Sequence, residues 1–191
     1  MTASESERVS GDGAAYVEKL WLMFDRLLVH SVAERALSSA AAKDLTATQF
    51  DGLRFLARHP HCTIGDIAGG LVVSYPAATR LVSRLEKRGL AARTPAQTDH
   101  RVVNVALTEL GSQAERSTRA RRAALLNRVM ENLPDSRRRS FVSNLERFLS
   151  STLTDRRLIT TVCLRCGTDH DDNCLVNRAN IALTGSPLSP I

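Results

Sequence analysis

Residues 74–88, with the sequence SYPAATRLVSRLEKR, decide the fold of this chain. Ser74 is a favourable N-cap residue and Gly89 a favourable terminator, so the stretch between them is predicted to be a single helix. At about 100° per residue its two sides separate by chemistry. The apolar side is Ala78, Leu81, Val82 and Leu85, and the opposite side is Pro76, Arg80, Ser83 and Lys87, flanked by Thr79 and Arg84. Only Glu86 offsets the cations Arg80, Arg84, Lys87 and Arg88, which indicates a polyanionic partner.

The segments on either side of this helix complete a recognisable motif. Residues 90–93 and 102–107 are short and strand-like, and a polar tip at residues 94–101 joins them. Before the helix, Thr63 and Asp66 form a capping box that opens another short helix, with a turn at residues 72–73. Two helices joined by a turn and followed by a basic-tipped hairpin form a winged helix-turn-helix.

Apolar periodicity predicts further helices outside this motif. A long helix is expected to begin at Ala14, and Thr46 with Gln49 forms a capping box for a helix that ends before Pro60. Thr108 caps a helix that reaches Asn132, and Pro134 lies in the first turn of the next. The predicted class is therefore mainly α, an α+β winged helix-turn-helix.

These residues resemble the MarR family of bacterial transcription regulators. The resemblance is carried by residues 45–50, Thr63 with residues 66–68, Ser74 with residues 85–90, Arg93 with residues 99–101, and residues 107–111. It spans residues 14–149 and implies a dimeric DNA-binding protein, here expected to be a repressor, whose operator affinity responds to a small molecule, oxidation or a metal. It also implies an effector crevice between the dimer helices and the DNA-binding lobe, near Trp21, Phe24 and Phe50.

The predicted organisation has five parts. They are a flexible leader (1–13), an N-terminal dimerisation helix region (14–44), the winged helix-turn-helix domain (45–111), C-terminal dimerisation helices (112–153) and a Cys-rich tail (154–191). The chain is expected to bind a palindromic operator in double-stranded DNA as a homodimer.

The predicted DNA-contacting residues come from the basic helix and the wing. They are Ser74, Tyr75, Pro76, Ala77, Thr79, Arg80, Ser83, Arg84, Lys87, Arg93, Asp99 and Arg101. Arg101 is expected to enter the minor groove, whose negative potential attracts arginine, with Asp99 orienting it or Arg93. A solvated surface charge is the alternative for each arginine, and a plain turn residue is the alternative for Asp99.

Composition agrees with a nucleic-acid partner. The net charge is +6 and the isoelectric point is near 9.7, and aromatic residues make up only 4% of the chain, which argues against single-strand binding by base stacking. No apolar run reaches the roughly 20 residues of a membrane-spanning helix, and no signal peptide is recognisable, so a cytoplasmic protein is expected.

The tail carries a second candidate site. Cys163, Cys166, His170 and Cys174 have the spacing C-x2-C-x3-H-x3-C, which suits a tetrahedral zinc site or an iron–sulfur cluster. A tight turn before Gly167 would point both sulfurs of the Cys pair the same way, and the helical pattern is expected to end at residues 155–157. A redox-switchable thiol pair is the second interpretation and an inert tail the third.

Two other side chains have structural interpretations. Cys62 is expected to be a buried, inert thiol, and His30 a core histidine rather than an effector ligand. A thiol- or metal-dependent enzyme is a competing class, but the chain contains no arrangement of nucleophile, base and orienting group. The prediction is therefore a regulator and not an enzyme.

Overall fold

The computed structural model describes residues 13–30, 45–95, 103–166 and 174–188. The helices are α1 (Gly13–Phe24), α3 (Ala47–Arg58), α4 (Ile64–Leu71), α5 (Tyr75–Lys87), α6 (Glu109–Glu131), α7 (Asp135–Thr152), α8 (Arg156–Cys166) and α9 (Leu175–Thr184), and a π-helical turn, η1 (Asp25–His30), follows α1. The strands are β1 (Ala91–Pro95) and β2 (Val103–Leu107). The fold is mainly helical with a two-stranded wing, as the sequence predicts. No helix in the described part of the chain is long and apolar enough to cross a membrane.

The winged lobe consists of α3, α4, α5 and the antiparallel pair β1–β2, in which Ala91 lies opposite Leu107 and Pro95 opposite Val103. Its core is made by apolar side chains from every one of these elements and from α6. They include Leu53, Ile67, Val82, Leu85 and Val105, each at most 1% exposed. Burial of these side chains is what holds the helices against the wing.

Local capping chemistry sets the helix starts as predicted. Both capping boxes form: Thr46 with Gln49 at α3, and Thr63 with Asp66 at α4. The turn into α5 is made by Val72, whose φ of 56° is left-handed, an uncommon conformation for a β-branched residue. Gly89 (φ 68°) ends α5 as expected, and glycine adopts this conformation without strain.

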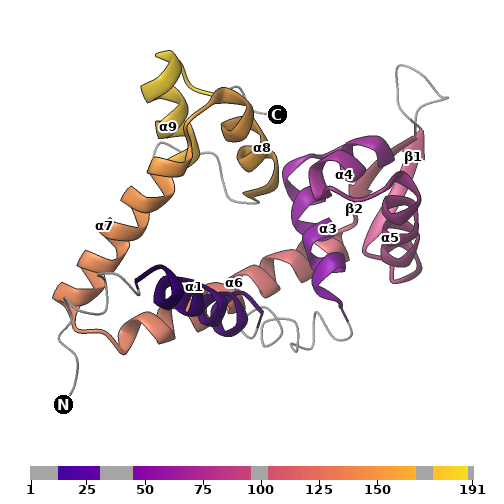
Figure 1. Ribbon diagram of the computed structural model, residues 1–191. Helices are drawn as coiled ribbons and strands as arrows, with labels where there is room; N and C mark the ends of the chain where they lie inside the picture. Colours follow the sequence, from indigo (N-terminus) through magenta and orange to yellow (C-terminus); the bar gives the residue numbers. More distant parts are fainter. Residues whose placement is uncertain (1–12, 31–44, 96–102, 167–173, 189–191) are drawn as a thin grey trace.

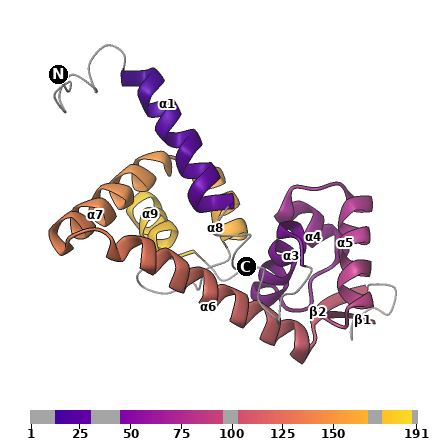
Figure 2. The ribbon, with the colours of Figure 1, turned by 90° about the horizontal axis from the view of Figure 1, so that it is seen from below.

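Helices α6, α7 and α8 form a path that leaves the winged lobe and returns to it. Figures 1 and 2 show α6 extending from the base of the wing, α7 turning back, and α8 reaching α3 and α4 again. Leu164 of α8 packs against the core of the lobe, and the guanidinium of Arg54 on α3 donates to the carbonyl oxygen of Cys166 at 2.6 Å.

The prediction that the helical pattern ends at residues 155–157 is wrong. Asp155 is an N-terminal cap, because its Oδ1 accepts from the backbone N–H of Leu158 at 2.8 Å. The apolar spacing of Leu158, Ile159 and Val162 is helical, and Ile159 is fully buried. At the other end of the chain, the predicted long helix begins one residue earlier, at Gly13, and becomes π-helical after Phe24.

Candidate nucleic-acid interface

Helix α5 has one face fixed in the core and one face open. Ala78, Leu81, Val82 and Leu85 are its buried residues, the four that periodicity predicts. The Ser74 hydroxyl accepts from the N–H of Ala77 at 3.4 Å, so the predicted N-cap is present. Tyr75 is 60% exposed at the start of the helix, next to exposed Pro76. Pro76 has no N–H and the N–H of Ala77 is used by Ser74, so the N–H of Tyr75 is the one in this first turn that can face a phosphate.

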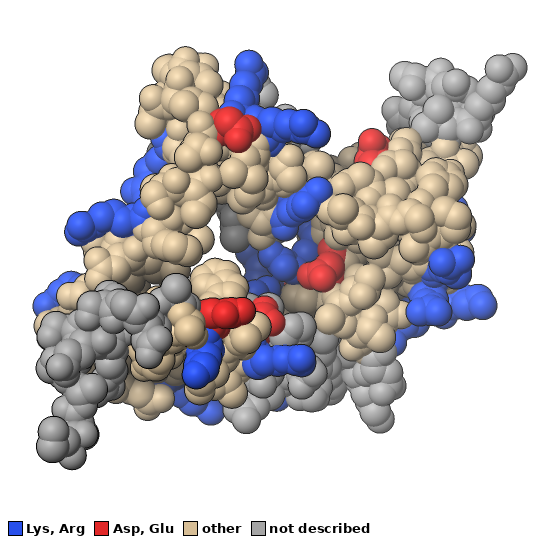
Figure 3. Space-filling view, viewed as in Figure 1, with Lys and Arg blue, Asp and Glu red and all other residues tan. Residues whose placement is uncertain are grey.

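The open face of α5 is cationic. Arg80, Arg84 and Lys87 are exposed, and none of them bonds to another side chain in the described parts of the chain. In Figure 3, Lys and Arg side chains gather at the α5 edge of the lobe. These groups remain available for an external anion. Thr79 is half-buried and its hydroxyl donates to the Tyr75 carbonyl at 2.9 Å, so that donor is already used within the helix.

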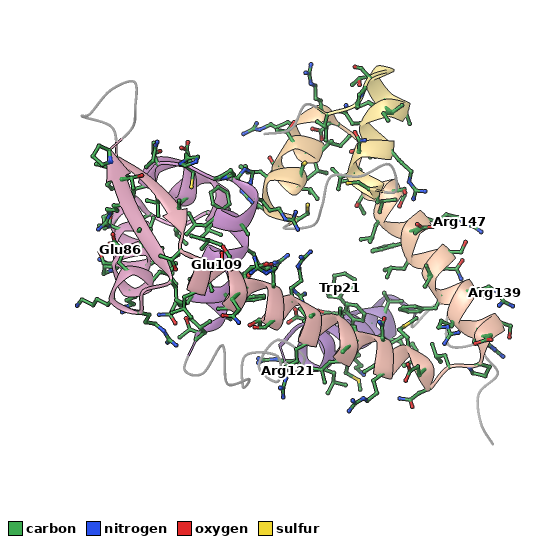
Figure 4. The ribbon with its side chains drawn as sticks, turned by 180° about the vertical axis from the view of Figure 1, so that it is seen from behind. Trp21, Glu86, Glu109, Arg121, Arg139 and Arg147 are labelled. Atoms are coloured by element: carbon green, nitrogen blue, oxygen red, sulfur yellow. The ribbon has the colours of Figure 1, made fainter. Side chains whose placement is uncertain are left out.

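Arg93 has a partner that sequence reasoning did not identify. Its guanidinium pairs with Glu86 at 2.5 Å and reaches the Ser83 hydroxyl at 3.4 Å, which links strand β1 to the polar face of α5. Figure 4 shows Glu86 at the outer edge of the lobe. The pair also neutralises the single carboxylate of α5. The expected partner Asp99, like Arg101, lies outside the described residues.

The base of the wing is joined to α6 by Thr108. Its backbone N–H donates to the Leu90 carbonyl at 3.1 Å, and its hydroxyl donates to the Gly89 carbonyl at 2.6 Å and accepts from the Gly111 N–H at 3.0 Å. One residue thus caps α6 and fixes the end of the recognition helix and the start of the wing. This arrangement holds α5 and the wing together as one rigid unit.

Comparisons with known proteins agree with this geometry. Residues 43–102 match the MarR family model. The chain belongs to the MarR family. It is 31% identical over 91 residues to the uncharacterized HTH-type transcriptional regulator YwhA of Bacillus subtilis (strain 168), covering 48% of this chain and 66% of that protein. The HTH-type transcriptional repressor MdtR of the same organism is 29% identical over 108 residues, 56% of this chain and 70% of that protein.

A solved structure extends the similarity of this MarR-family chain beyond the lobe. The crystal structure of RV1404 from Mycobacterium tuberculosis superposes with a TM-score of 0.64 and 26% identity, covering 77% of this chain and 99% of that one. The named relatives are transcription regulators, which supports the prediction of a regulator rather than an enzyme.

The cysteines of the tail lie on helices. Cys163 and Cys166 are one turn apart in α8, not in the tight turn that was predicted, and Cys174 is the N-cap residue of α9. Burial raises the pKa of the Cys163 thiol, and the neighbouring thiols of Cys166 and Cys174 raise it further. His170 is outside the described residues. Within the described ranges, no three potential ligands converge on one point, although three soft thiolates suit zinc or an iron–sulfur cluster chemically.

Cys62 is a buried thiol, as predicted. It is 7% exposed, and its backbone carbonyl accepts from the N–H of Val105 at 2.7 Å, which attaches the α3–α4 connection to the wing. Burial, with a smaller contribution from Asp66, raises the pKa of Cys62 to about 11. The thiol is therefore neutral and unreactive near neutral pH. His30 ends η1, and Phe50 is buried in the core of the lobe.

Proposed function

We propose that this MarR-family chain is a sequence-specific transcriptional repressor that binds an inverted repeat in double-stranded DNA as a homodimer. The observation that carries the proposal is α5, whose apolar face is buried while Arg80, Arg84 and Lys87 are exposed on the other side. A rigid helix with an open cationic face has the form of a major-groove reader. The name of the relative MdtR supports repression rather than activation.

In this proposal the exposed residues of α5 have two kinds of role. Tyr75, Pro76, Ala77, Arg80 and Arg84 face base edges or adjacent phosphates, while Ser83 and Lys87 contact the backbone. Arg93 holds the wing against α5 through Glu86, and Arg101 enters the minor groove with Asp99 as its orienting partner. Phosphate contacts fix the register of the helix, and base contacts supply the specificity.

The dimer is supported by apolar side chains that the single chain leaves exposed. On α1, Trp21 is 56% and Leu22 is 58% exposed, and on α7, Phe148 is 50% exposed. Trp21 also lies 6.1 Å from Phe148, ring centroid to centroid, so α1 and α7 together present one apolar surface. A surface of this kind marks a protein interface. A two-fold dimer would place its recognition helices about one DNA turn, roughly 10 base pairs, apart.

Binding is tested with an inverted repeat selected from random DNA. We expect gel shifts to favour this repeat over a scrambled sequence of equal composition by about a thousandfold, as for specific binders. Light scattering should give twice the chain mass at micromolar concentration. Equal affinity for the scrambled DNA would instead indicate a nonspecific architectural binder, and a monomeric mass would exclude the two-fold arrangement.

We further propose that operator affinity is modulated at Cys163, Cys166 and Cys174. The modulating event is the binding of a metal ion or an iron–sulfur centre, with His170 as the fourth ligand, or oxidation of the thiols. The placement of Cys163 and Cys166 one turn apart on α8, with Cys174 at the start of α9, supports this. Burial and, to a smaller extent, the neighbouring Cys166 and Cys174 raise the pKa of Cys163. The cysteines would supply thiolates, and thiol deprotonation releases a proton for each sulfur that binds metal.

Metal analysis and a visible absorption spectrum of anaerobically purified protein test the tail. Zinc in colourless protein supports a structural site, and iron with sulfide supports a cluster. Cys163→Ser should abolish the centre, whereas the buried control Cys62→Ser should leave it intact. Metal-free protein whose DNA affinity is insensitive to oxidant would mean an inert tail.

A small aromatic effector, with the zinc tail purely structural, is the second candidate function. A groove of about 450 Å³ between α3, β2 and α6 supports it. Its lining includes Leu56 together with the charged or titratable side chains Arg58, His61, Glu115, Arg116 and Arg119. Arg119 pairs with Glu115 and Arg116 with Glu109, and the arginines of the lining outnumber its single carboxylate. Such a groove suits an aromatic carboxylate, so added benzoate should release the operator. Release that Arg116→Ala does not weaken would argue against this groove.

A further inference from the structure

The helix that bears two of the tail thiols ends on the DNA-binding lobe of its own chain. Arg54 of α3 donates from Nη2 to the carbonyl oxygen of Cys166 at 2.6 Å, a contact between residues 112 positions apart in the sequence. The last four carbonyls of an α-helix have no partner within the helix, and this guanidinium provides one for Cys166. A cation at this end also interacts favourably with the helix dipole.

Apolar packing accompanies this hydrogen bond. Leu164, in the same last turn of α8, packs against the core of the winged lobe. The two contacts come from different chemistry but fix the same end of the helix. The α8–lobe contact is therefore a defined interface and not a chance approach of one side chain.

The contact closes the path formed by α6, α7 and α8. Arg178 of α9 pairs with Glu146 of α7 at 3.1 Å, so the helices of the tail are attached to the dimerisation region. Their other attachment is to α3 and α4 (Figure 2). The winged lobe is thus held at two places, by its covalent connection to α6 and by its contact with α8.

Arg54 also lies among charged groups where α3 meets α6. It is 3.5 Å from Asp51, and its positive charge, after burial, lowers the pKa of Arg122 on α6. The Cys166 carbonyl and Asp51 offset the repulsion between the two arginines. If the carbonyl is withdrawn, less negative potential remains between the arginines of α3 and α6.

We propose that α8 is a latch between the tail thiols and the DNA-binding lobe, and that Arg54 is the positioning residue through which the state of those thiols alters operator affinity. The inference rests on the proposed regulatory role of the tail. In the conformation described, no three potential ligands converge among the described residues, so gathering the thiols around one ion requires movement at the end of α8 or the start of α9. Cys166 belongs both to that thiol set and, through its carbonyl, to the latch.

The test compares operator affinity with and without Zn²⁺ in the full-length protein. For the wild type we expect zinc to change the operator Kd by about fivefold or more, the usual lower range for coupled sites. Arg54→Ala should bind zinc with unchanged stoichiometry while its Kd moves by less than about twofold. The matched control is Arg165→Ala, which also removes one arginine charge, but from an exposed position in the last turn of α8. Its operator Kd should respond to zinc as that of the wild type does.

A second pair of variants and a second readout separate the possible failures. Leu164→Ala should also lose the zinc response, whereas Leu158→Ala, at a position 38% exposed, should keep it. Amide hydrogen exchange in α8 should be faster in Arg54→Ala than in the wild type. A zinc response in Arg54→Ala equal to that of the wild type, or unchanged exchange in α8, overturns the latch. A wild type that binds zinc without any change in Kd overturns the proposed sensing function itself, and the latch with it.

Discussion

Gly111→Ala is the substitution whose effect the structure specifies most closely. Gly111 lies in the first turn of α6, where a β-carbon would overlap the carbonyl oxygen of Leu90 and lie 2.8 Å from its carbonyl carbon. That oxygen cannot move away easily, because it accepts a hydrogen bond of 3.1 Å from the N–H of Thr108. The substitution must therefore separate α6 from the base of the wing.

A second helical glycine provides the reference. A β-carbon at Gly69 of α4 would meet nothing within 4 Å, so Gly69→Ala should stabilise the protein by up to about 1 kcal/mol through helix propensity. Gly111→Ala gains the same propensity, which cancels in the comparison. The remaining difference is steric, and overpacking of this kind costs about 1–3 kcal/mol. The upper end is expected here, because the clash is with backbone and not with a flexible side chain.

The assay is urea unfolding followed by far-ultraviolet circular dichroism. Both variants must be measured at the same protein concentration, because the stability of a dimer depends on concentration. The free energy of unfolding of Gly111→Ala should be lower than that of Gly69→Ala by about 2–3 kcal/mol. Equal stabilities would refute the close approach of α6 to Leu90 and with it the described junction of helix and wing.

Three other predictions follow from the site. Arg80→Ala should lower the slope of log Kd against log salt by about one unit, because one phosphate contact is lost. The control is Arg139→Ala, which should leave the slope unchanged, since the Arg139 side chain points outward from α7 in Figure 4. Glu86→Gln should free Arg93 and tighten binding to scrambled DNA, measured by fluorescence anisotropy. The loss of the ion pair should lower the free energy of unfolding by less than about 1 kcal/mol, because the pair is partly exposed. Weaker DNA binding would mean that the pair acts mainly by positioning the wing. Burial raises the pKa of Cys62 from 9.0 to about 11, so the stability that the neutral thiol contributes is complete below pH 9 and is lost as pH rises through 11. The free energy of unfolding of the wild type should therefore fall over this window by about 2–3 kcal/mol more than that of Cys62→Ala. Parallel curves for the two proteins would contradict the buried thiol.

The sequence alone determined the local elements of this protein. Both capping boxes, the end of α5 at Gly89 and the buried side of α5 follow from residues within about one helical turn of each other. The thiol of Cys62 was also predicted to be buried, from its place between two helices. Such features are predictable because helix caps and helix faces are decided by neighbours in the sequence.

The tertiary structure decided which distant groups meet. Arg93 pairs with Glu86 across the junction of strand and helix, a partner that the sequence did not indicate. Nothing near Arg54 in the sequence indicates that it binds the carbonyl of Cys166. The helix at Arg156–Cys166 was missed although its apolar spacing was visible, because the Cys spacing suggested a turn. Partners of this kind depend on how separately folded surfaces pack together, and no local periodicity encodes that choice.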